Sequence, residues 1–259
     1  FDQGINYFDT APGYCDDQSE AIFGVAFKGM PRDQFYVSTK GMPTSFDTAE
    51  KAREAVHKSL KHLGVEKIDF YHVWCLRKME HYDLAMRAGG QYEGLKQCQA
   101  EGLIEHIVCS SHQPGNEIRT ILRQGHFEGV LMGINILNFP YRWDGVAAAA
   151  EFGAGVAAMN PLAGGAIPQH EKELAFLARD GETPTEAALR FLVSAPEVNI
   201  ALNGFTSREH IDMACRVAEK AEPFTHTETD AIRRNLGEYI TAMCTGCGYC
   251  KGCPQDIPV

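Results

Sequence analysis

Gly4-Ile5-Asn6-Tyr7-Phe8-Asp9-Thr10-Ala11 contains a short run of strand-forming residues that ends on a carboxylate. Tyr14 follows in the next loop, and a second apolar run, Phe35-Tyr36-Val37-Ser38-Thr39, ends on Lys40. Parallel strands that present charged residues at their carboxyl ends are how barrel enzymes build their sites. A cation beside a phenol lowers the pKa of the phenol, and a carboxylate holds that cation in place. We therefore predict that Asp9, Tyr14 and Lys40 form a general acid–base site.

Strands and helices alternate along the rest of the chain. Apolar runs predict strands over 5–8, 35–39, 68–74, 104–110, 129–135, 156–159 and 199–203. Helical periodicity predicts helices over about 48–63, 92–100, 117–123, 146–152, 171–179, 184–194 and 207–219, with a long loop over 76–90. Seven such repeats indicate an α/β fold, a (β/α)8 TIM barrel, whose first strand we expect ahead of Phe1 in a longer protein.

The composition narrows the possible partners and the domain organisation. A net charge of −10 argues against a nucleic-acid or anionic-membrane surface, and no apolar run reaches the length of about 18 residues that a membrane span needs. We expect residues 1–222 to form the barrel. Residues 223–259 should form a C-terminal segment, in which a polar amphipathic helix over 225–243 leads to a cysteine cluster.

Four of the nine cysteines are clustered near the end of the chain. Cys244, Cys247, Cys250 and Cys253 are each separated by two residues, and Pro254 follows. Zinc sites of four cysteines usually consist of two well-separated pairs, whereas iron–sulfur clusters are held by closely spaced thiolates followed by proline. We favour one 4Fe-4S cluster over zinc or free thiols. Such clustering also indicates a reducing compartment, and hence a cytoplasmic protein.

At the motifs that contain Asp9, Tyr14 and Lys40, the chain resembles the aldo-keto reductases. The resemblance lies in Gly-Ile-Asn-Tyr-Phe-Asp-Thr-Ala, the later Tyr, Ser-Glu-x-x-x-Gly and Ser-Thr-Lys, and it implies catalytic roles for Asp9, Tyr14 and Lys40. The cysteine-rich tail resembles the iron–sulfur branch of that family. The resemblance therefore implies NADP(H)-dependent hydride transfer to or from a carbonyl or alcohol carbon of a small molecule.

The same resemblance assigns cofactor contacts to several polar and glycine residues. Ser110 matches the serine that binds the nicotinamide carboxamide, and Gly164-Gly165 would approach the pyrophosphate. The adenosine end and its 2'-phosphate would be held by Gly204, Thr206, Ser207 and Glu209. Two positions depart from the family, because Leu131 stands where a glutamine is expected and Ala214 where an asparagine is expected.

The catalytic histidine of the family is also absent. Its position on the strand Asp69-Phe70-Tyr71-His72-Val73-Trp74 holds Trp74, which we expect to shape the substrate pocket. His72 lies two residues earlier on the same strand face, so we expect a buried histidine with a satisfied hydrogen bond. His112, in the loop after Ser110, is either a replacement polar group in the substrate pocket or a solvated loop residue.

Three functions are compatible with these features. The first is a reductase or dehydrogenase that uses NADP(H), with a cluster that either carries single electrons or ties the tail to the barrel. The second is an iron–sulfur electron-transfer oxidoreductase that does not use nicotinamide; a redox-active cluster would need a ferredoxin-type electron partner. The third is a non-catalytic barrel that binds a nucleotide as a sensor. Intact Asp9, Tyr14 and Lys40 favour the first.

Overall fold

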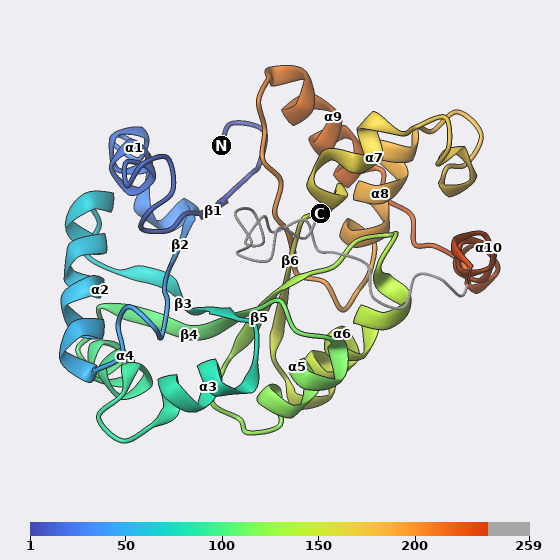
Figure 1. The fold of residues 1–259 in the computed structure, drawn as a ribbon. Coiled ribbons are helices and arrows are strands. Elements are labelled where there is room, and N and C mark those ends of the chain that lie inside the picture. Colours follow the sequence, from blue (N-terminus) through green and yellow to red (C-terminus); the bar gives the residue numbers. More distant parts are fainter. Residues whose placement is uncertain (238–259) are drawn as a thin grey trace. The chain divides into compact units, whose positions relative to one another are not determined.

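The computed structural model describes residues 1–237, in which strands alternate with helices (Figure 1). The strands are β1 (Tyr7–Asp9), β2 (Tyr36–Gly41), β3 (Ile68–Leu76), β4 (Ile104–Ser111), β5 (Gly129–Gly133), β6 (Gly155–Met159) and β7 (Ile200–Ala201). They follow the chain order within one sheet, and the pairs from β1–β2 to β4–β5 are parallel. All seven predicted strands are therefore confirmed within the described residues, which do not test the eighth.

The helices bring three corrections to the predicted pattern, of which one is that the helix predicted over 225–243 spans His226–Leu236 and ends before Gly237. The helices are α1 (Ser19–Ala26), α2 (Ala49–Leu63), α3 (Met79–Met86), α4 (Gln91–Ala100), α5 (Gly115–Leu122), α6 (Phe139–Phe152), α7 (Ala166–Gln169), α8 (Pro184–Val193), α9 (Arg208–Glu219) and α10 (His226–Leu236), with 3-10 turns η1 (Arg32–Gln34), η2 (Ala163–Gly165) and η3 (Ala175–Leu177). The loop predicted over 76–90 contains α3, which buries Tyr82 and Ala85 one turn apart. The helix predicted over 171–179 is wrong: only Leu177 is buried there, so no apolar stripe supports an α-helix.

Local sequence explains how the helices begin and end. The Thr48 hydroxyl accepts a hydrogen bond from the Lys51 amide at the start of α2, and Gly64 ends that helix with a φ of 64°. The apolar face of α2 is buried. Thr183 and Glu186 form a reciprocal capping box at the start of α8.

The Ser-Glu pair that opens α1 anchors this helix to the strands. The Thr10 hydroxyl donates to Ser19 Oγ at 2.7 Å, and the Thr39 hydroxyl donates to the buried Glu20 carboxylate at 2.7 Å. A buried carboxylate is tolerated when such donors satisfy it. Because Thr10 follows Asp9 and Thr39 precedes Lys40, this anchor also fixes the strand ends that carry the predicted catalytic residues.

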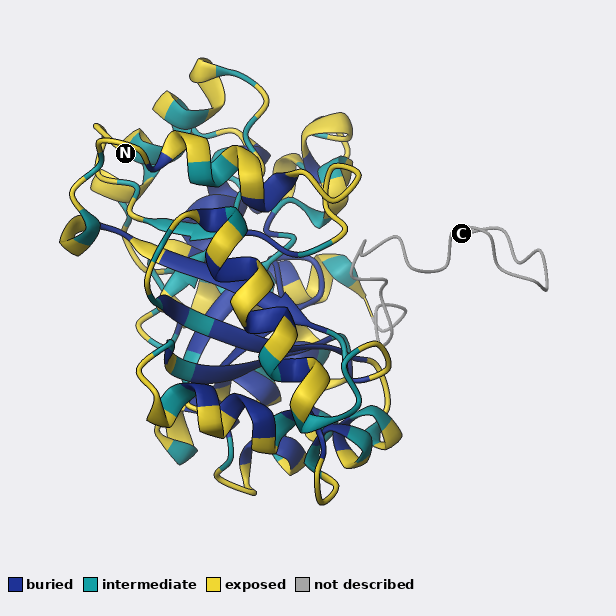
Figure 2. Ribbon diagram, turned by 90° about the vertical axis from the view of Figure 1, so that its left-hand side faces the viewer, coloured by how far each residue is buried: buried dark blue, intermediate teal, exposed yellow. Residues whose placement is uncertain are grey.

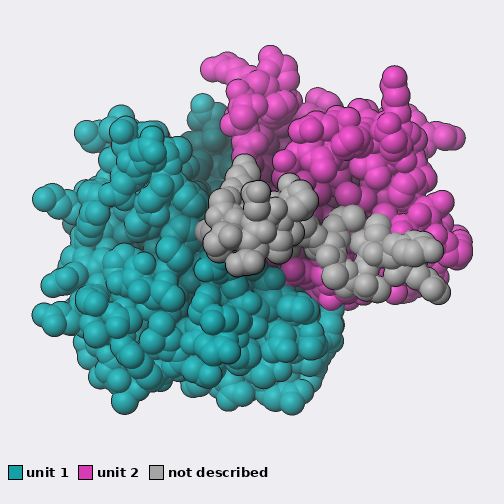
Figure 3. Space-filling model, in the orientation of Figure 1, with its two compact units in different colours: residues 1–132, 144–157 teal, residues 133–143, 158–259 magenta. Residues whose placement is uncertain are grey.

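The chain divides into two compact units (Figure 3). Unit 1 contains residues 1–132 and 144–157, and unit 2 contains residues 133–143 and 158 onward. The strands are largely buried and the helices expose their outer faces (Figure 2). None of the helices within residues 1–237 is both long and apolar enough to cross a bilayer. The boundary expected between residues 222 and 223 stays a prediction, since its C-terminal side lies mostly outside the described residues.

Candidate active site

In unit 1, strands β1 and β2 bring Asp9 and Lys40 together. The two strands pair in parallel with Asp9 opposite Ser38, so Lys40 lies one side-chain repeat further toward the strand end. Lys40 Nζ lies 2.5 Å from Asp9 Oδ2, and the lysine side chain is 1% exposed. An ammonium group this deeply buried needs a carboxylate partner to offset its lost hydration. The predicted pairing of these two residues is therefore what the structure contains.

Tyr14 lies in the loop between β1 and α1, beside this ion pair. Lys40 Nζ lies 5.5 Å from the centre of the Tyr14 ring. The loop turns through three successive residues with left-handed backbone, Cys15, Asp16 and Asp17, whose φ values are 52°, 54° and 65°. The Asp17 carboxylate accepts a hydrogen bond from the Gly13 amide at 3.0 Å, which closes the turn. Non-glycine residues in this region are strained, and such strain concentrates at functional sites.

The expected effect of Lys40 on the Tyr14 phenol is not found. Desolvation of the phenol, followed by the negative charge of Asp9, raises the pKa of Tyr14 above its ordinary value, although the residue as a whole is 40% exposed. Lys40 is held by Asp9 at 2.5 Å, so the pair presents little net positive charge to the ring. In this arrangement Tyr14 keeps its proton at neutral pH, and the prediction of a lowered pKa is wrong.

Trp74 packs against Tyr14 because β3 is irregular at this point. The two rings lie edge to face with centroids 5.6 Å apart and an interplanar angle of 85°. The pairing of β3 with β4 shifts between Val73 and Leu76, and Cys75 there has a φ of 63°. Such bulges redirect side chains at the end of a strand. The structure thus places Trp74 beside Tyr14. This position is the one expected of a residue that shapes the substrate pocket.

His72 lies deeper on the same strand and is 2% exposed. Its Nε2 lies 2.9 Å from Ser38 Oγ, and its Nδ1 lies 3.4 Å from the Cys109 carbonyl oxygen. The prediction of a buried histidine with a hydrogen-bond partner is confirmed. Burial, followed by the charge of Lys40, lowers the pKa of His72 to about 4, so this imidazole is neutral at neutral pH.

Ser110 and His112 lie at the end of β4. The Ser110 hydroxyl is buried and has no hydrogen-bond partner in the described part of the chain. Its neighbour across the sheet is the buried Leu131, which cannot provide one. An orphaned buried hydroxyl costs free energy unless a ligand group completes it. His112 is half-buried, its amide donates to the Leu76 carbonyl oxygen at 3.1 Å, and its place in the substrate pocket stays a prediction.

Unit 2 contains the predicted phosphate-binding residues around a cavity of about 400 Å³. Its wall includes Asn160, Pro161, Leu162, Gly164, Gly165, Leu202, Asn203, Gly204, Phe205, Thr206 and His210. Gly164 and Gly165 both have left-handed backbone, with φ values of 67° and 94°. The Gly165 amide donates to the Leu162 carbonyl oxygen at 3.0 Å, and the lack of side chains at both positions lets a ligand approach the backbone closely.

Helix α9 begins beside this cavity. The Ser207 hydroxyl caps the helix by accepting from the His210 amide at 3.4 Å. The pKa of Glu209 lies below its usual value, because the carboxylate accepts hydrogen bonds from the Glu209 backbone N–H and from the Ser207 hydroxyl. The N-terminus of a twelve-residue helix carries partial positive charge that favours phosphate. Of the predicted residues here, Gly164, Gly165, Gly204 and Thr206 line the cavity, while Ser207 and Glu209 form the helix start.

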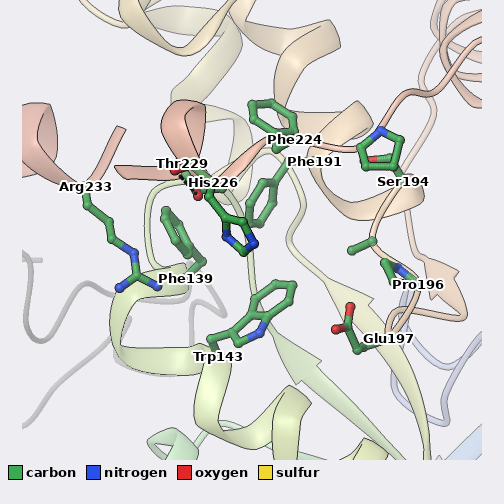
Figure 4. A pocket seen from close by; sticks show the side chains of 12 residues that line it. Phe139, Trp143, Phe191, Ser194, Pro196, Glu197, Phe224, His226, Thr229 and Arg233 are labelled. Atoms are coloured by element: carbon green, nitrogen blue, oxygen red, sulfur yellow. Dashed lines mark hydrogen bonds between the residues drawn. The ribbon is translucent and has the colours of Figure 1, made fainter. Parts of the chain in front are cut away.

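A second cavity in unit 2, of about 390 Å³, was not predicted from the sequence (Figure 4). Four aromatic residues line it, namely Phe139, Trp143, Phe191 and Phe224. The Arg233 guanidinium lies 5.0 Å above the centre of the Phe139 ring. The lining comes from α6, α8 and α10 and from the loops that follow α8 and precede α10, which are far apart in the sequence. A local sequence motif could therefore not have predicted this cavity.

The predicted metal ligands lie beyond the described residues. Cys244, Cys247, Cys250 and Cys253 belong to the segment 238–259, and their structure is not described. Within residues 1–237 no group of three or more histidine, cysteine or carboxylate side chains is arranged to hold a metal ion. No disulfide bond joins the five cysteines of this part, which are Cys15, Cys75, Cys98, Cys109 and Cys215.

A buried lysine–carboxylate pair beside a tyrosine, at the carboxyl ends of parallel strands, defines an acid–base enzyme built from βα repeats. A model of the aldo/keto reductase family matches residues 1–235, and the chain belongs to this family. The family expected from the motif around Asp9 is therefore confirmed. The iron–sulfur branch is a finer assignment that this match does not address.

Two relatives show how far the similarity extends. The chain is 25% identical over 215 residues to D-threo-aldose 1-dehydrogenase from a Pseudomonas species, and this alignment covers 72% of the chain and 64% of the relative. It is 24% identical over 244 residues to L-galactose dehydrogenase from Arabidopsis thaliana, covering 82% and 73%. The chain thus spans less than two thirds of the length of the first of these relatives.

Solved structures share the fold. The aldo-keto reductase AKR11C1 from Bacillus halodurans, in its holo form, aligns with a TM-score of 0.72 at 24% identity, covering 93% of this chain and 86% of that one. An aldo/keto reductase from Klebsiella pneumoniae, solved in complex with NADP and acetate, aligns with a TM-score of 0.73 at 21% identity, covering 90% and 81%. These likenesses confirm the βα-barrel architecture predicted from the sequence.

Proposed function

We propose that this chain is an NADP(H)-dependent oxidoreductase that reduces a carbonyl group, or oxidises the corresponding alcohol, on a small molecule. The observation that carries the proposal is the buried Asp9–Lys40 ion pair beside Tyr14. Burying two charges costs several kcal/mol per ion before their attraction is counted, so such a pair is a weak device for stability alone. Ionisable groups held this way next to a tyrosine are typical of proton-transfer sites.

The acid–base step would run through Tyr14. NADP(H), when bound, supplies the hydride to the carbonyl carbon or takes it from the alcohol carbon. In reduction, the Tyr14 hydroxyl gives its proton to the carbonyl oxygen as the carbon gains the hydride, which yields the alcohol and a phenolate. The Lys40 ammonium stabilises that phenolate, and Asp9 keeps Lys40 charged and oriented. The raised pKa means that Tyr14 holds its proton at neutral pH but is a weak acid on its own, so proton donation would depend on Lys40 stabilising the phenolate.

Features of both units support NADP(H) as the cofactor. In unit 1, the orphaned Ser110 hydroxyl suits a carboxamide group, because it is buried and still has its hydrogen bond to make. In unit 2, the left-handed Gly164-Gly165 pair and the capped start of α9 suit phosphate groups. Thr206 lines the same cavity as the two glycines and offers a hydroxyl.

Trp74 points to a substrate with an extended apolar face. An indole packed edge to face on Tyr14 places an apolar ring beside the reacting group, with 9% of the residue exposed. The two curated relatives are named as dehydrogenases of aldoses or galactose. We propose a sugar or another cyclic alcohol, together with the matching carbonyl compound. Trp74→His should then lower activity on cyclic substrates while improving reduction of simple aldehydes, and a gain on both would contradict this assignment.

We further propose one 4Fe-4S cluster on Cys244, Cys247, Cys250 and Cys253 in a cytoplasmic protein. Four thiolates separated by two residues each, with a proline after the last, match the ligand chemistry of such clusters. If the cluster carries electrons, a ferredoxin-type protein is the partner. Anaerobic purification should yield about four irons per chain, one for each thiolate. Stoichiometric zinc without iron would show that the site is a zinc site.

The decisive test compares wild type with Tyr14→Phe and with Tyr36→Phe as a matched control. Tyr36 is an exposed tyrosine at the start of β2, so its hydroxyl should be dispensable. Positioned acid–base groups contribute roughly 10²- to 10⁴-fold, so Tyr14→Phe should lose about that much turnover with NADPH and keep its cofactor affinity. Full activity in Tyr14→Phe would refute the mechanism. NADPH binding without turnover in wild type would favour the sensor, and absence of binding would favour nicotinamide-independent electron transfer.

A further inference from the structure

Three polar side chains form a row beneath the proposed acid–base site, one on each of three neighbouring strands of unit 1. They are Asp9 on β1, Ser38 on β2 and His72 on β3. Ser38 Oγ lies 2.7 Å from Asp9 Oδ1, and His72 Nε2 lies 2.9 Å from Ser38 Oγ. Strand pairing places them there, because Asp9 is opposite Ser38 and Lys40 is opposite His72. Ser38 and His72 are fully buried or nearly so.

The number of protons in this row determines which side chain donates each hydrogen bond. An ionised carboxylate can only accept, so the single Ser38 proton must point to Asp9. The contact between Ser38 and His72 then requires a proton on His72 Nε2. A neutral imidazole has one N–H, so Nδ1 faces the Cys109 carbonyl oxygen without a proton, and this is the longest contact of the row at 3.4 Å.

The opposite tautomer would change the environment of Asp9. With the proton on Nδ1, His72 would donate to the Cys109 carbonyl oxygen, and the Ser38 hydroxyl would turn to Nε2. Asp9 would then lose one of its two side-chain donors and keep Lys40 alone. A carboxylate with fewer donors has a higher proton affinity and a stronger negative field.

The groups around His72 keep it neutral. Burial and the charge of Lys40 on β2 disfavour the imidazolium, and together they outweigh Asp9 on β1 and the Cys109 carbonyl on β4, which favour it. On β4, the Cys109 thiol has its pKa raised by burial and is therefore uncharged. Tyr7 on β1 interacts with Ser38, and burial, followed by the charge of Asp9, raises its pKa, so Tyr7 is neutral as well. His72 therefore acts as a neutral donor rather than as a charge.

We propose that His72 is a positioning residue, whose Nε2–H orients Ser38 so that the serine hydroxyl remains a second donor to Asp9. This role rests on the proposed function of Asp9, Lys40 and Tyr14. Without the second donor, the stronger negative field of Asp9 would raise the pKa of Tyr14 further, because Asp9 already acts on it in that direction. His72 would thus adjust the acidity of Tyr14 from two strands away, without touching substrate or cofactor.

The first test reads the tautomer directly and does not depend on turnover. ¹⁵N NMR of the full-length chain should show His72 protonated on Nε2, with its signals assigned by their loss in His72→Gln. In Ser38→Ala the Nε2–H has no acceptor from Ser38, so the proton should move to Nδ1 and donate to the Cys109 carbonyl oxygen. A wild-type His72 protonated on Nδ1, or a tautomer unchanged in Ser38→Ala, would overturn the proposal even if the chain proved inactive.

The second test compares two replacements of His72 in turnover assays. Gln can offer an amide N–H toward Ser38, whereas Leu cannot. His72→Leu should lower kcat about tenfold or more, since hydrogen bonds to charged groups are worth about 1.5–3 kcal/mol, and should leave the KM for NADPH unchanged. Its pH–rate limb for alcohol oxidation should move upward by about one pH unit. His72→Gln should retain most activity and the wild-type limb.

The exposed His106 on β4 provides the matched control, because His106→Gln removes an imidazole that pairs with Glu128 outside this row. Wild-type kinetics are expected for it. Equal losses in His72→Leu and His72→Gln with an unmoved pH limb would mean that His72 only fills space, and would overturn the proposal. Unchanged activity in both variants would overturn it as well.

Discussion

Replacing Lys40 with methionine should destabilise unit 1 strongly, because it removes one member of a buried ion pair. Methionine fills similar space with no charge. The Asp9 side chain is 15% exposed, so its carboxylate would be left partly desolvated, with the Ser38 hydroxyl still donating to it. Removing one partner of a buried pair typically costs about 3–5 kcal/mol of unfolding free energy. We expect Lys40→Met to fall at the lower end of this range.

A surface lysine supplies the comparison. Lys51 pairs with Asp47 one helical turn away at 2.8 Å, but their side chains are 56% and 33% exposed. Exposed pairs of this kind contribute little to stability. Urea unfolding followed by tryptophan fluorescence would measure both variants, since Trp74 packs on Tyr14 beside the buried pair. Losses in Lys40→Met and Lys51→Met that agree within about 1 kcal/mol would refute the reasoning.

A double variant isolates the origin of the loss. If the cost arises from an unpaired buried charge, then Asp9→Asn should recover part of the stability in the Lys40→Met background, because the amide carries no charge. The same Asp9→Asn change in wild type should destabilise, since it leaves the Lys40 ammonium without its carboxylate. Additive losses would mean that the two residues do not act as a pair.

Three further outcomes are expected. The pKa of His72 falls from 6.5 in the unfolded chain to about 4 in the folded chain. The stabilisation that follows, about 3 kcal/mol, is complete above pH 6.5 and is lost as the pH falls toward 4. A pH series of urea midpoints should show this loss in wild type but not in His72→Gln. Gly24→Ala should destabilise by about 1–3 kcal/mol in the same assay, because a Cβ there would lie 2.3 Å from the His62 carbonyl oxygen, whereas Gly204→Ala meets open space and should be neutral. Leu131→Gln should tighten NADPH binding by roughly two- to twelvefold in fluorescence titrations, by restoring one hydrogen bond worth about 0.5–1.5 kcal/mol.

Much of the fold could be predicted because the strands are short apolar runs and some helices, such as α2, end at a glycine. Gly64 ends α2 where the sequence indicated, and strands buried on both faces lack the alternation that would confuse them with surface strands. Helix α3 escaped prediction because its eight residues carry few buried positions. The segment 171–179 has a helical periodicity in its sequence, but only Leu177 of η3 is buried against the rest of the protein. That lack of packing could be seen only in the tertiary structure.

The sequence allowed the residues of the site to be predicted, but their geometry only in part. Asp9 and Lys40 meet because parallel strands place their ends at one edge, and this rule needs only the sequence. The position of Trp74 depends on the irregular pairing at Cys75, whose left-handed backbone has no sequence signal such as glycine. The orphaned Ser110 hydroxyl is likewise visible only once its neighbours are known.

The pKa of Tyr14 shows why residue types alone mislead about chemistry. A lysine near a phenol lowers the phenol's pKa when the lysine acts as a net positive charge. Here Asp9 lies 2.5 Å from Lys40 Nζ, while the Tyr14 ring centre lies 5.5 Å away. At that distance the pair acts as a dipole, whose field falls faster than that of a charge, and burial decides the direction. Any group that weakens the hold of Asp9 on Lys40 would return positive charge to the phenol, and Ser38, with His72 behind it, is placed to do this by sharing the Asp9 carboxylate.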